Sequence, residues 1–221
     1  MAVQVVVFDV MGTLFDLAPV RRKLGELGAP EGALEAWFGR MLHSAAALTI
    51  VGEFRPFSEI GETTLRATLA QLEVDPDGAA EVLQALGALD AYPEATQAFD
   101  LLHEAGVPAV TLTNGGREHT ERLLERAGLR HRVQRVITVD EVQAYKPHRE
   151  PYLHTARTLG LPPAALALIA AHGWDVVGAR AASLTAVWID RLEKRWPFPT
   201  DEPPTARDLV EAVELALARS E

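Results

Sequence analysis

The sequence predicts a doubly wound α/β fold with a helical segment inserted near its start. Short apolar runs alternate along the chain with segments whose apolar residues recur at helical spacing. The first run, residues 3–8, shows little polar alternation, as expected of a strand buried on both faces of a parallel sheet. Residues 17–90 break the pattern, because they show helical periodicity and no convincing strand. Right-handed crossovers between the strands then place helices on both faces of one sheet.

The predicted core alternates strands with helices. We expect the strand over residues 3–8 to be the central one. Several of the helices end at a Gly, which is a common helix terminator. The other predicted strands cover residues 109–113, 133–139, 167–171 and 185–189. The predicted core helices cover residues 93–105, 117–127, 150–159 and 174–182.

Four further helices are predicted within the inserted segment. They cover residues 19–27, 32–48, 57–72 and 77–89, with turns of Gly-Ala-Pro, Val-Gly-Glu and Pro-Asp-Gly between them. We interpret residues 16–90 as a helical cap domain, and residues 1–15 and 91–221 as the α/β core domain. The alternative is that these helices merely cover one face of the sheet.

Composition narrows the class of protein. The chain has 221 residues and a formal charge of -10, and this acidic field would repel nucleic acid and anionic membrane surfaces. There is no Cys, which excludes a disulfide framework, a thiolate zinc site and a thiol nucleophile. The start of the chain shows no basic segment, cleavage site or apolar run of membrane-spanning length. We therefore expect a cytoplasmic protein.

Polar residues follow the ends of the first four predicted strands, where ligands bind in open α/β sheets. They are Asp9 after the first strand, Thr113 and Asn114 at the second, Lys146 in the loop after the third and Asp175 beyond the fourth. A desolvated and oriented Asp can act as a nucleophile. A nearby Lys would keep it ionised and would neutralise an anionic substrate. This pattern indicates a catalytic site centred on Asp9.

Simpler interpretations exist for several of these side chains. Asp9 and Asp175 could each cap the helix that follows, while Asp175 could instead orient Lys146 or activate a water. Gly12 and Thr13 suit a tight turn that would place backbone N–H groups and a hydroxyl around the Asp9 carboxylate. His172 is suited to be a general base near neutral pH, but it could equally hydrogen-bond a loop carbonyl.

Taken in order, four motifs resemble those of the haloacid dehalogenase superfamily, and within it the type II, or L-2-haloacid dehalogenase, branch. The resemblance spans nearly the whole chain and implies a Rossmann-like core with a four-helix cap that covers the substrate. The motifs are Phe8-Asp9-Val10-Met11-Gly12-Thr13-Leu14-Phe15-Asp16, then Thr111-Leu112-Thr113-Asn114-Gly115, then Lys146-Pro147 with Tyr152 six residues after the Lys, then Trp174-Asp175 ahead of Gly178-Ala179.

The resemblance also implies roles for single residues. Asp9 would be the nucleophile. Its implied partners are Thr13 and Thr113 as positioning groups, Lys146 as the positive charge, and Tyr152 and Asp175 as the rest of the pocket. Further candidate substrate contacts are Met11, Asn114, Phe38, Arg40 and Trp174. Dehalogenases of this family work without metal or other cofactor, its phosphatases use magnesium, and dimers are common in the type II branch, so a homodimer is expected.

Two positions favour a dehalogenase over a phosphatase. Family phosphatases carry an Asp two positions after the nucleophile, which protonates the leaving alkoxide, and an acidic magnesium ligand four positions before the equivalent of Asp175. Here these positions hold Met11 and Ala171. A halide leaves without proton or metal. We therefore expect a metal-independent 2-haloacid dehalogenase that acts through an aspartyl ester on Asp9, with Asp175 or His172 activating the hydrolytic water.

Departures from the type II pattern keep two alternatives open, namely a magnesium-dependent phosphatase and an idle family member that binds an anion or a partner. The branch has Tyr, Asn and Ser where this chain has Met11, His172 and Ala170. Its early cap helix also carries an Arg that grips the substrate. The nearest candidate here is Arg40, which lies about 200° around the helix from Phe38, so only one of these two can face the pocket. Otherwise Arg40 is a solvated surface residue.

Overall fold

The sheet of the protein is parallel throughout. The structure is a computed structural model that describes residues 2–218. Its six strands lie in the order β3-β2-β1-β4-β5-β6, so β1 is central between β2 and β4. This confirms the predicted α/β fold. The strands are β1 (Val5–Phe8), β2 (Ala109–Thr113), β3 (Val133–Thr138), β4 (Leu166–Ala170), β5 (Thr185–Ile189) and β6 (Thr205–Ala206).

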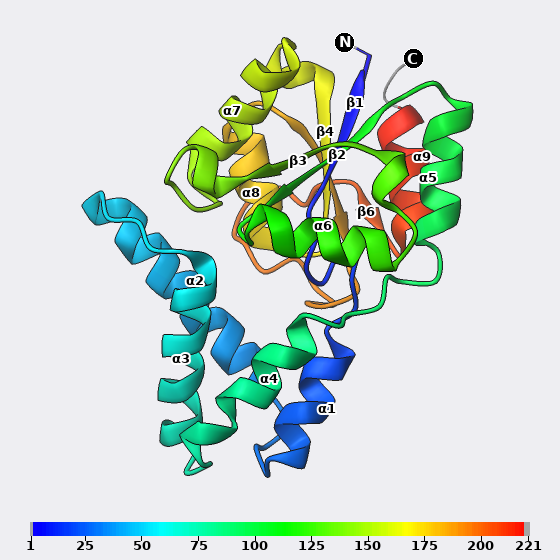
Figure 1. The fold of residues 1–221 in the computed structure, drawn as a ribbon. Coiled ribbons are helices and arrows are strands. Elements are labelled where there is room, and N and C mark those ends of the chain that lie inside the picture. Colours follow the sequence, from blue (N-terminus) through cyan, green and yellow to red (C-terminus); the bar gives the residue numbers. More distant parts are fainter. Residues whose placement is uncertain (1, 219–221) are drawn as a thin grey trace.

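Helices cover both faces of the sheet (Figure 1). Successive side chains of a strand point to opposite faces, so Val6 and Phe8 enter one apolar cluster while Val5 and Val7 enter another. The first cluster receives α5 (Ala95–Glu104), α6 (Arg117–Arg126) and α9 (Leu209–Ala218). The second receives α7 (Arg149–Leu159) and α8 (Gly173–Ala181). Both faces of β1 are thereby dry, which explains its unbroken apolar sequence.

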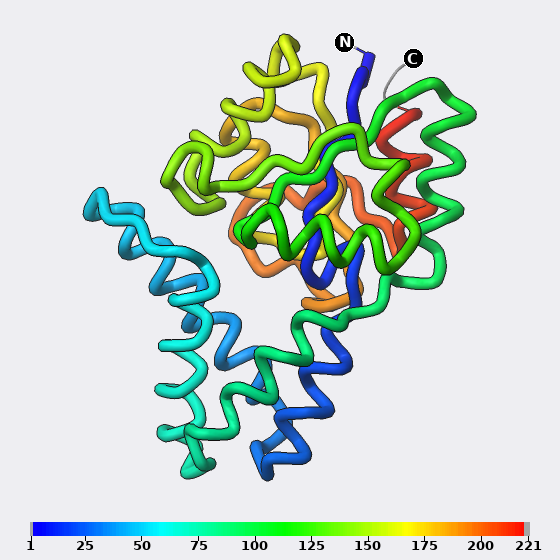
Figure 2. Tube along the Cα trace, in the orientation of Figure 1, coloured from blue at the N-terminus to red at the C-terminus, as the bar shows by residue number. Residues whose placement is uncertain are grey.

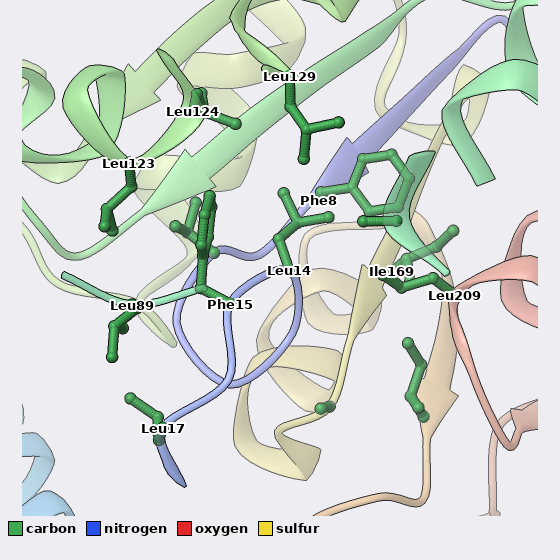
Figure 3. Close-up of a cluster of buried hydrophobic side chains, with 14 of the residues drawn as sticks. Phe8, Leu14, Phe15, Leu17, Leu89, Leu123, Leu124, Leu129, Ile169 and Leu209 are labelled. Atoms are coloured by element: carbon green, nitrogen blue, oxygen red, sulfur yellow. The ribbon is translucent and has the colours of Figure 1, made fainter. Parts of the chain in front are cut away.

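Four helices lie together beyond the carboxyl end of β1, as Figures 1 and 2 show. They are α1 (Ala18–Glu26), α2 (Ala33–Val51), α3 (Phe57–Gln71) and α4 (Ala79–Leu86), the last preceded by a 3-10 turn at Pro76–Gly78. The two segments that connect the sheet to these helices lie side by side, because the Asp16 N–H donates to the Asp90 carbonyl at 2.9 Å. Phe15, Leu17 and Leu89 carry the first apolar cluster across this junction (Figure 3). That these helices form a separate domain over residues 16–90 stays a prediction.

The sequence-based element boundaries differ from the structure at several places. β1 starts at Val5 rather than residue 3, and α4 is shorter than the helix expected over 77–89. The short strand β6 and the helix α9 were missed altogether. β6 has two residues and pairs only with Trp188 and Ile189, too little for a periodic signal. The start of α9 does carry a sequence signal, because Asp is a preferred N-cap residue. Asp208 fills this role and accepts a hydrogen bond from the Glu211 N–H at 2.9 Å.

Candidate active site

A tight turn after β1 shapes the surroundings of Asp9. Gly12 has a φ of +77°, and its N–H donates to the Phe15 carbonyl at 2.8 Å. A Cβ on Gly12 would lie 3.0 Å from His172 Nε2, so the position requires Gly for both conformation and space. The turn brings Thr13 back over Asp9, and the Thr13 hydroxyl donates to Asp9 Oδ2 at 2.7 Å. Thr13 Oγ1 is itself fixed by the Ala171 N–H at 2.9 Å.

Lys146 joins the ends of three strands. Its buried ammonium donates to Asp9 Oδ1 at 2.9 Å, to Asp175 Oδ2 at 2.6 Å and to the Leu112 carbonyl at 2.9 Å. These bonds use all three donors of the ammonium. Asn114 holds the Lys146 backbone in place, because the Lys146 N–H donates to Asn114 Oδ1 at 3.0 Å. Asn114, expected as a substrate contact, therefore acts on the position of Lys146.

The two carboxylates are engaged by side chains and not by helix ends. Asp175 Oδ1 accepts a hydrogen bond from the Tyr152 hydroxyl at 2.6 Å, and both side chains are fully buried. The residue before α8 is His172, so Asp175 lies inside the first turn and does not cap the helix. Asp9 likewise precedes no helix directly, since α1 begins at Ala18. The capping interpretation is wrong for both residues.

Burial and charge move the pKa values of the two carboxylates in opposite directions. Burial alone would raise the pKa of Asp9, but the Lys146 ammonium, helped by His172 and Thr13, outweighs it and holds that pKa below its ordinary value. Burial raises the pKa of Asp175, and the nearby Asp9 charge adds to the rise against the opposing effect of Lys146. Burial would lower the pKa of Lys146, but Asp175 and Asp9 together raise it. A carboxylate that stays ionised thus faces one that accepts a proton more readily.

Thr113 does not reach Asp9 as the resemblance implied. Its hydroxyl oxygen accepts a hydrogen bond from the Gly115 N–H at 2.9 Å. Short-range bonds of this kind are typical of a Thr at the end of a strand, where the side chain stabilises its own turn. We therefore correct the expected role of Thr113 from positioning Asp9 to shaping the loop that carries Asn114.

His172 lies between Asp9 and two aromatic side chains, Phe38 and Trp174. Its Nε2 lies 2.9 Å from the Met11 carbonyl and 3.9 Å from Asp9 Oδ2. Because a carbonyl only accepts, Nε2 carries the hydrogen. The imidazole ring stacks on Phe38 of α2 at 5.1 Å and on Trp174 of α8 at 5.3 Å between ring centres. The loop-carbonyl interpretation of His172 is therefore realised, and any role as a base would fall to Nδ1.

A cavity of about 350 Å³ opens beside these aromatic rings. Phe38, His172 and Trp174 line it, together with Arg191 and Glu193 from the loop after β5. Arg40 does not line it, because the Arg40 guanidinium donates to the side chain of Gln71 on α3. Of the pair on α2, Phe38 faces the site. Sequence reasoning missed Arg191 and Glu193, although their place after a predicted strand was a usable signal.

The donor set does not fit a magnesium ion. Among the residues that the structure describes, Asp9 and Asp175 are the only carboxylates that bind the Lys146 ammonium, and it already occupies one oxygen of each. Met11 and Ala171 offer no side-chain oxygen. Within residues 2–218, no three His, Asp or Glu side chains come together in a cluster that could hold a metal ion.

The fold and the site together define a hydrolase built on a parallel α/β sheet. The chain belongs to the haloacid dehalogenase-like hydrolase family, whose model matches residues 3–183. The resemblance to the type II branch is confirmed by individual relatives. The chain is 30% identical to the (S)-2-haloacid dehalogenase of Xanthobacter autotrophicus, over 87% of its own length and 77% of the relative. It is 27% identical to that of Pseudomonas sp. (strain YL), over 98% and 97% of the two chains.

Solved structures agree with the sequence relatives. A crystal structure of an L-2-haloacid dehalogenase superposes with a TM-score of 0.91 at 27% identity, covering 98% of this chain and 99% of the other. The L-2-haloacid dehalogenase of Xanthobacter autotrophicus with chloropropionic acid covalently bound superposes with a TM-score of 0.85 at 25% identity. That alignment covers 96% of this chain and 98% of the other.

Proposed function

We propose that this protein is a metal-independent 2-haloacid dehalogenase. The observation that carries the proposal is the state of Asp9, which is buried and held ionised by Lys146 and Thr13. The positions that would serve phosphoryl transfer hold Met11 and Ala171 instead. A dry, ionised carboxylate without an adjacent acid or metal suits displacement of a leaving group that departs as a stable anion. The dehalogenase relatives support the same chemistry.

The proposed reaction has two steps. In the first, an Asp9 carboxylate oxygen attacks the carbon that bears the halogen, and the halide leaves with the bonding electrons. This forms an ester between Asp9 and the acid. In the second, water attacks the Asp9 carbonyl carbon, the ester bond breaks, and the 2-hydroxy acid and a proton are released. Asp175 or His172 would accept the proton from the water. The raised pKa of Asp175 supports Asp175 as the acceptor.

We further propose that helices α1–α4, residues 16–90, act as a cap over the substrate. The stacking of Phe38 on His172 supports this, because it places α2 against the wall of the site. A covered site excludes water from the attack on carbon, and the ester is then reached only by a bound water.

The first experiment measures halide release from 2-chloropropionate and 2-bromopropionate in the presence of EDTA. We expect turnover by the wild type, and a loss of about a thousandfold or more for Asp9→Asn. Asp77→Asn, an exposed aspartate with 93% of its side chain accessible, is the matched control and should keep full activity. Phosphate release from an aryl phosphate with magnesium, without halide release, would overturn the proposal.

A single-turnover reaction in H₂¹⁸O tests the ester directly. With enzyme in excess, hydrolysis at the Asp9 carbonyl leaves one ¹⁸O in the Asp9 carboxylate and none in the product. Peptide mass spectrometry of the segment containing Asp9 reads this out. Label in the product alone would mean that water attacks the substrate carbon, which contradicts the ester mechanism.

The remaining expectations concern setting and assembly. None of the helices within residues 2–218 is long and apolar enough to span a membrane. We propose that the enzyme acts on a small anionic acid in the cytoplasm, without a cofactor and as a homodimer. Sedimentation velocity tests the dimer, and full activity after exhaustive dialysis against a chelator tests the independence from metal.

A further inference from the structure

The residue before Lys146 packs against helices α2 and α3. Tyr145 is buried, and its ring stacks on Phe54 with 5.1 Å between the ring centres. Its ring centre lies 5.5 Å from that of Phe57, the first residue of α3. The Tyr145 hydroxyl donates to the backbone carbonyl of Arg55. Burial raises the pKa of this hydroxyl, so it stays protonated and remains a donor. Tyr145 is thereby anchored to the turn that joins α2 to α3.

Two successive backbone N–H groups hold this segment to two different parts of the molecule. The Tyr145 N–H donates to Thr49 Oγ1 of α2 at 3.1 Å. The Lys146 N–H donates to Asn114 Oδ1, just beyond β2, at 3.0 Å. The Thr49 hydroxyl itself donates to the Ala45 carbonyl at 2.9 Å, so its one hydrogen is used and its oxygen is left to accept from Tyr145. The backbone at Lys146 is therefore placed by α2 as well as by the loop after β2.

One face of α2 makes these contacts. Phe38, Ala45 and Thr49 lie on the same side of the helix to within about 40°, because their spacings of seven and four residues are close to whole turns. Phe38 stacks on His172 near one end of this face. Ala45 is fully buried in an apolar cluster with Tyr145, which Thr49 meets at the other end. A movement of α2 away from the sheet would break the contacts with His172 and with Tyr145 together.

The Lys146 ammonium depends on an accurate position. It donates to Asp9, to Asp175 and to the Leu112 carbonyl at 2.9, 2.6 and 2.9 Å, which uses all three of its hydrogens. Its side chain is fully buried, so no solvent water replaces a bond that is lost. A shift of the backbone at Tyr145 would therefore weaken the hold of Lys146 on Asp9.

We propose that Tyr145 is a positioning residue that makes the placement of Lys146 depend on helices α2 and α3. The two helices seat the Tyr145 ring and its backbone N–H, and the adjoining Lys146 then reaches Asp9 and Asp175. The full set of bonds to Asp9 forms only while α2 packs against this segment, so covering the substrate and completing the site around the nucleophile are coupled. The inference rests on the proposed function and adds to it a residue that acts on Asp9 through Lys146.

Chemical labelling of lysines tests the proposal. The chain contains three lysines, at positions 23, 146 and 194. After brief treatment of the folded protein with acetic anhydride, peptide mass spectrometry gives the acetylation rate of each one. A lysine reacts only as a free amine that meets the reagent, so the buried and paired Lys146 should react far more slowly than the exposed Lys194. The acetylation rate of Lys146 thus measures how firmly its ammonium is held.

The decisive variant lies on α2, outside the Lys146 group. Thr49→Val removes the acceptor of the Tyr145 N–H and keeps the shape of the side chain. It should raise the acetylation rate of Lys146 by about tenfold, as expected when a partly buried N–H loses its acceptor. Thr49→Ser keeps the hydroxyl and should restore the wild-type rate. Tyr145→Leu, which removes the ring, should raise the rate further, and Thr49→Val carries the test alone if Tyr145→Leu does not fold.

Thr68→Val is the matched control. Thr68 of α3 is buried, and its hydroxyl donates to the Thr64 carbonyl at 2.8 Å, the same kind of bond that Thr49 makes within α2. No hydrogen bond among the described residues joins its side chain to the segment of Tyr145, so the Lys146 rate should stay close to that of the wild type. Urea unfolding of each variant gives the rate expected from global unfolding, which is subtracted. After this subtraction, equal Lys146 rates in Thr49→Val and wild type would overturn the proposal, as would equal rates in Thr49→Val and Thr49→Ser.

The acetylation rate does not depend on the reaction. A Lys146 rate that responds to Thr49→Val, in a protein that releases no halide from any 2-haloacid, would leave the positioning role standing and remove the dehalogenase function. Halide release with an unresponsive Lys146 rate would do the reverse. In an active enzyme, Thr49→Val should lower kcat for 2-chloropropionate by about tenfold and change KM much less, and Thr49→Ser should restore kcat.

Discussion

The ammonium of Lys146 lies 2.9 Å from Asp9 Oδ1, although 137 positions separate the two residues in sequence. The same ammonium donates to Asp175 Oδ2 at 2.6 Å. One positive charge therefore serves two carboxylates in a buried group. The pKa of Asp9 is lowered and that of Asp175 is raised. Four predictions depend on these two carboxylates, on Lys146 and on the residues that hold them.

Loss of Lys146 should damage both stability and activity. Lys146→Gln leaves two buried carboxylates without their cation, which commonly costs about 3–5 kcal/mol of unfolding free energy. Halide release should fall by about a hundredfold or more. Urea unfolding and steady-state kinetics measure the two effects. Lys23→Gln, which removes the cation of surface ion pairs with Glu26 and Glu81, should change the unfolding free energy far less. Equal stability of the two variants would show that Lys146 is not balancing the carboxylates.

The group that activates the hydrolytic water can be identified by a stalled ester. In Asp175→Asn, we expect one halide per active site and then little turnover, with the acid still attached to Asp9. His172→Gln should continue to turn over, because Gln preserves a donor to the Met11 carbonyl. Rapid-quench halide measurements and intact-protein mass follow both. If His172→Gln stalls and Asp175→Asn does not, His172 is the base.

The two chemical steps should respond differently to acid. The pKa of Asp9 lies below its ordinary value, so Asp9 stays ionised and the halide burst should persist to a lower pH than an ordinary Asp would allow. The pKa of Asp175 lies above its ordinary value, so Asp175 becomes protonated first and ester hydrolysis should slow at a higher pH. Ester should therefore accumulate in mild acid. Coincident acid limbs for burst and turnover would contradict the assignment.

Gly178 of α8 packs where no side chain fits. A Cβ there would lie 2.5 Å from the Tyr152 hydroxyl and 2.8 Å from Pro147 Cβ. Gly178→Ala must displace groups that hold Asp175 and Lys146, so we expect a loss of about 1–3 kcal/mol and a lower kcat. Gly25→Ala, in α1 with nothing within 4 Å of its Cβ, is the control. It should be neutral or stabilising by up to about 1 kcal/mol, as thermal unfolding will show.

Much of the fold could be predicted because its signal is local. An apolar run buried on both faces, such as β1, differs in pattern from an amphipathic helix, and the predicted strands β2 and β5 have the bounds of the structure. The approach of Asp9, Lys146 and Asp175 followed from one topological rule, since parallel strands end at the same edge. Their roles in catalysis stay predictions.

Two side chains, one that the sequence analysis misplaced and one that it missed, depend on partners far along the chain. Arg40 turns to Gln71 on another helix, and Arg191 is held by Glu94, 97 positions away. Neither partner can be predicted from the spacing of residues along the sequence. Thr113 shows the opposite case, because its hydroxyl oxygen accepts from the Gly115 N–H only two residues on, and its described hydrogen bonds include none to Asp9. The helical repeat alone predicted that only one of Phe38 and Arg40 faces the pocket.

The central position of β1 in the sheet has a consequence for how the chain folds during synthesis. Its neighbours β2 and β4 begin at residues 109 and 166, and Asp175 follows later still. During synthesis, the segment that bears Asp9 leaves the ribosome before either neighbouring strand, and also before Lys146 and Asp175. A chain that ends before Asp175 therefore carries the Asp9 carboxylate without its complete set of partners, so halide release would report that synthesis and folding have passed β4.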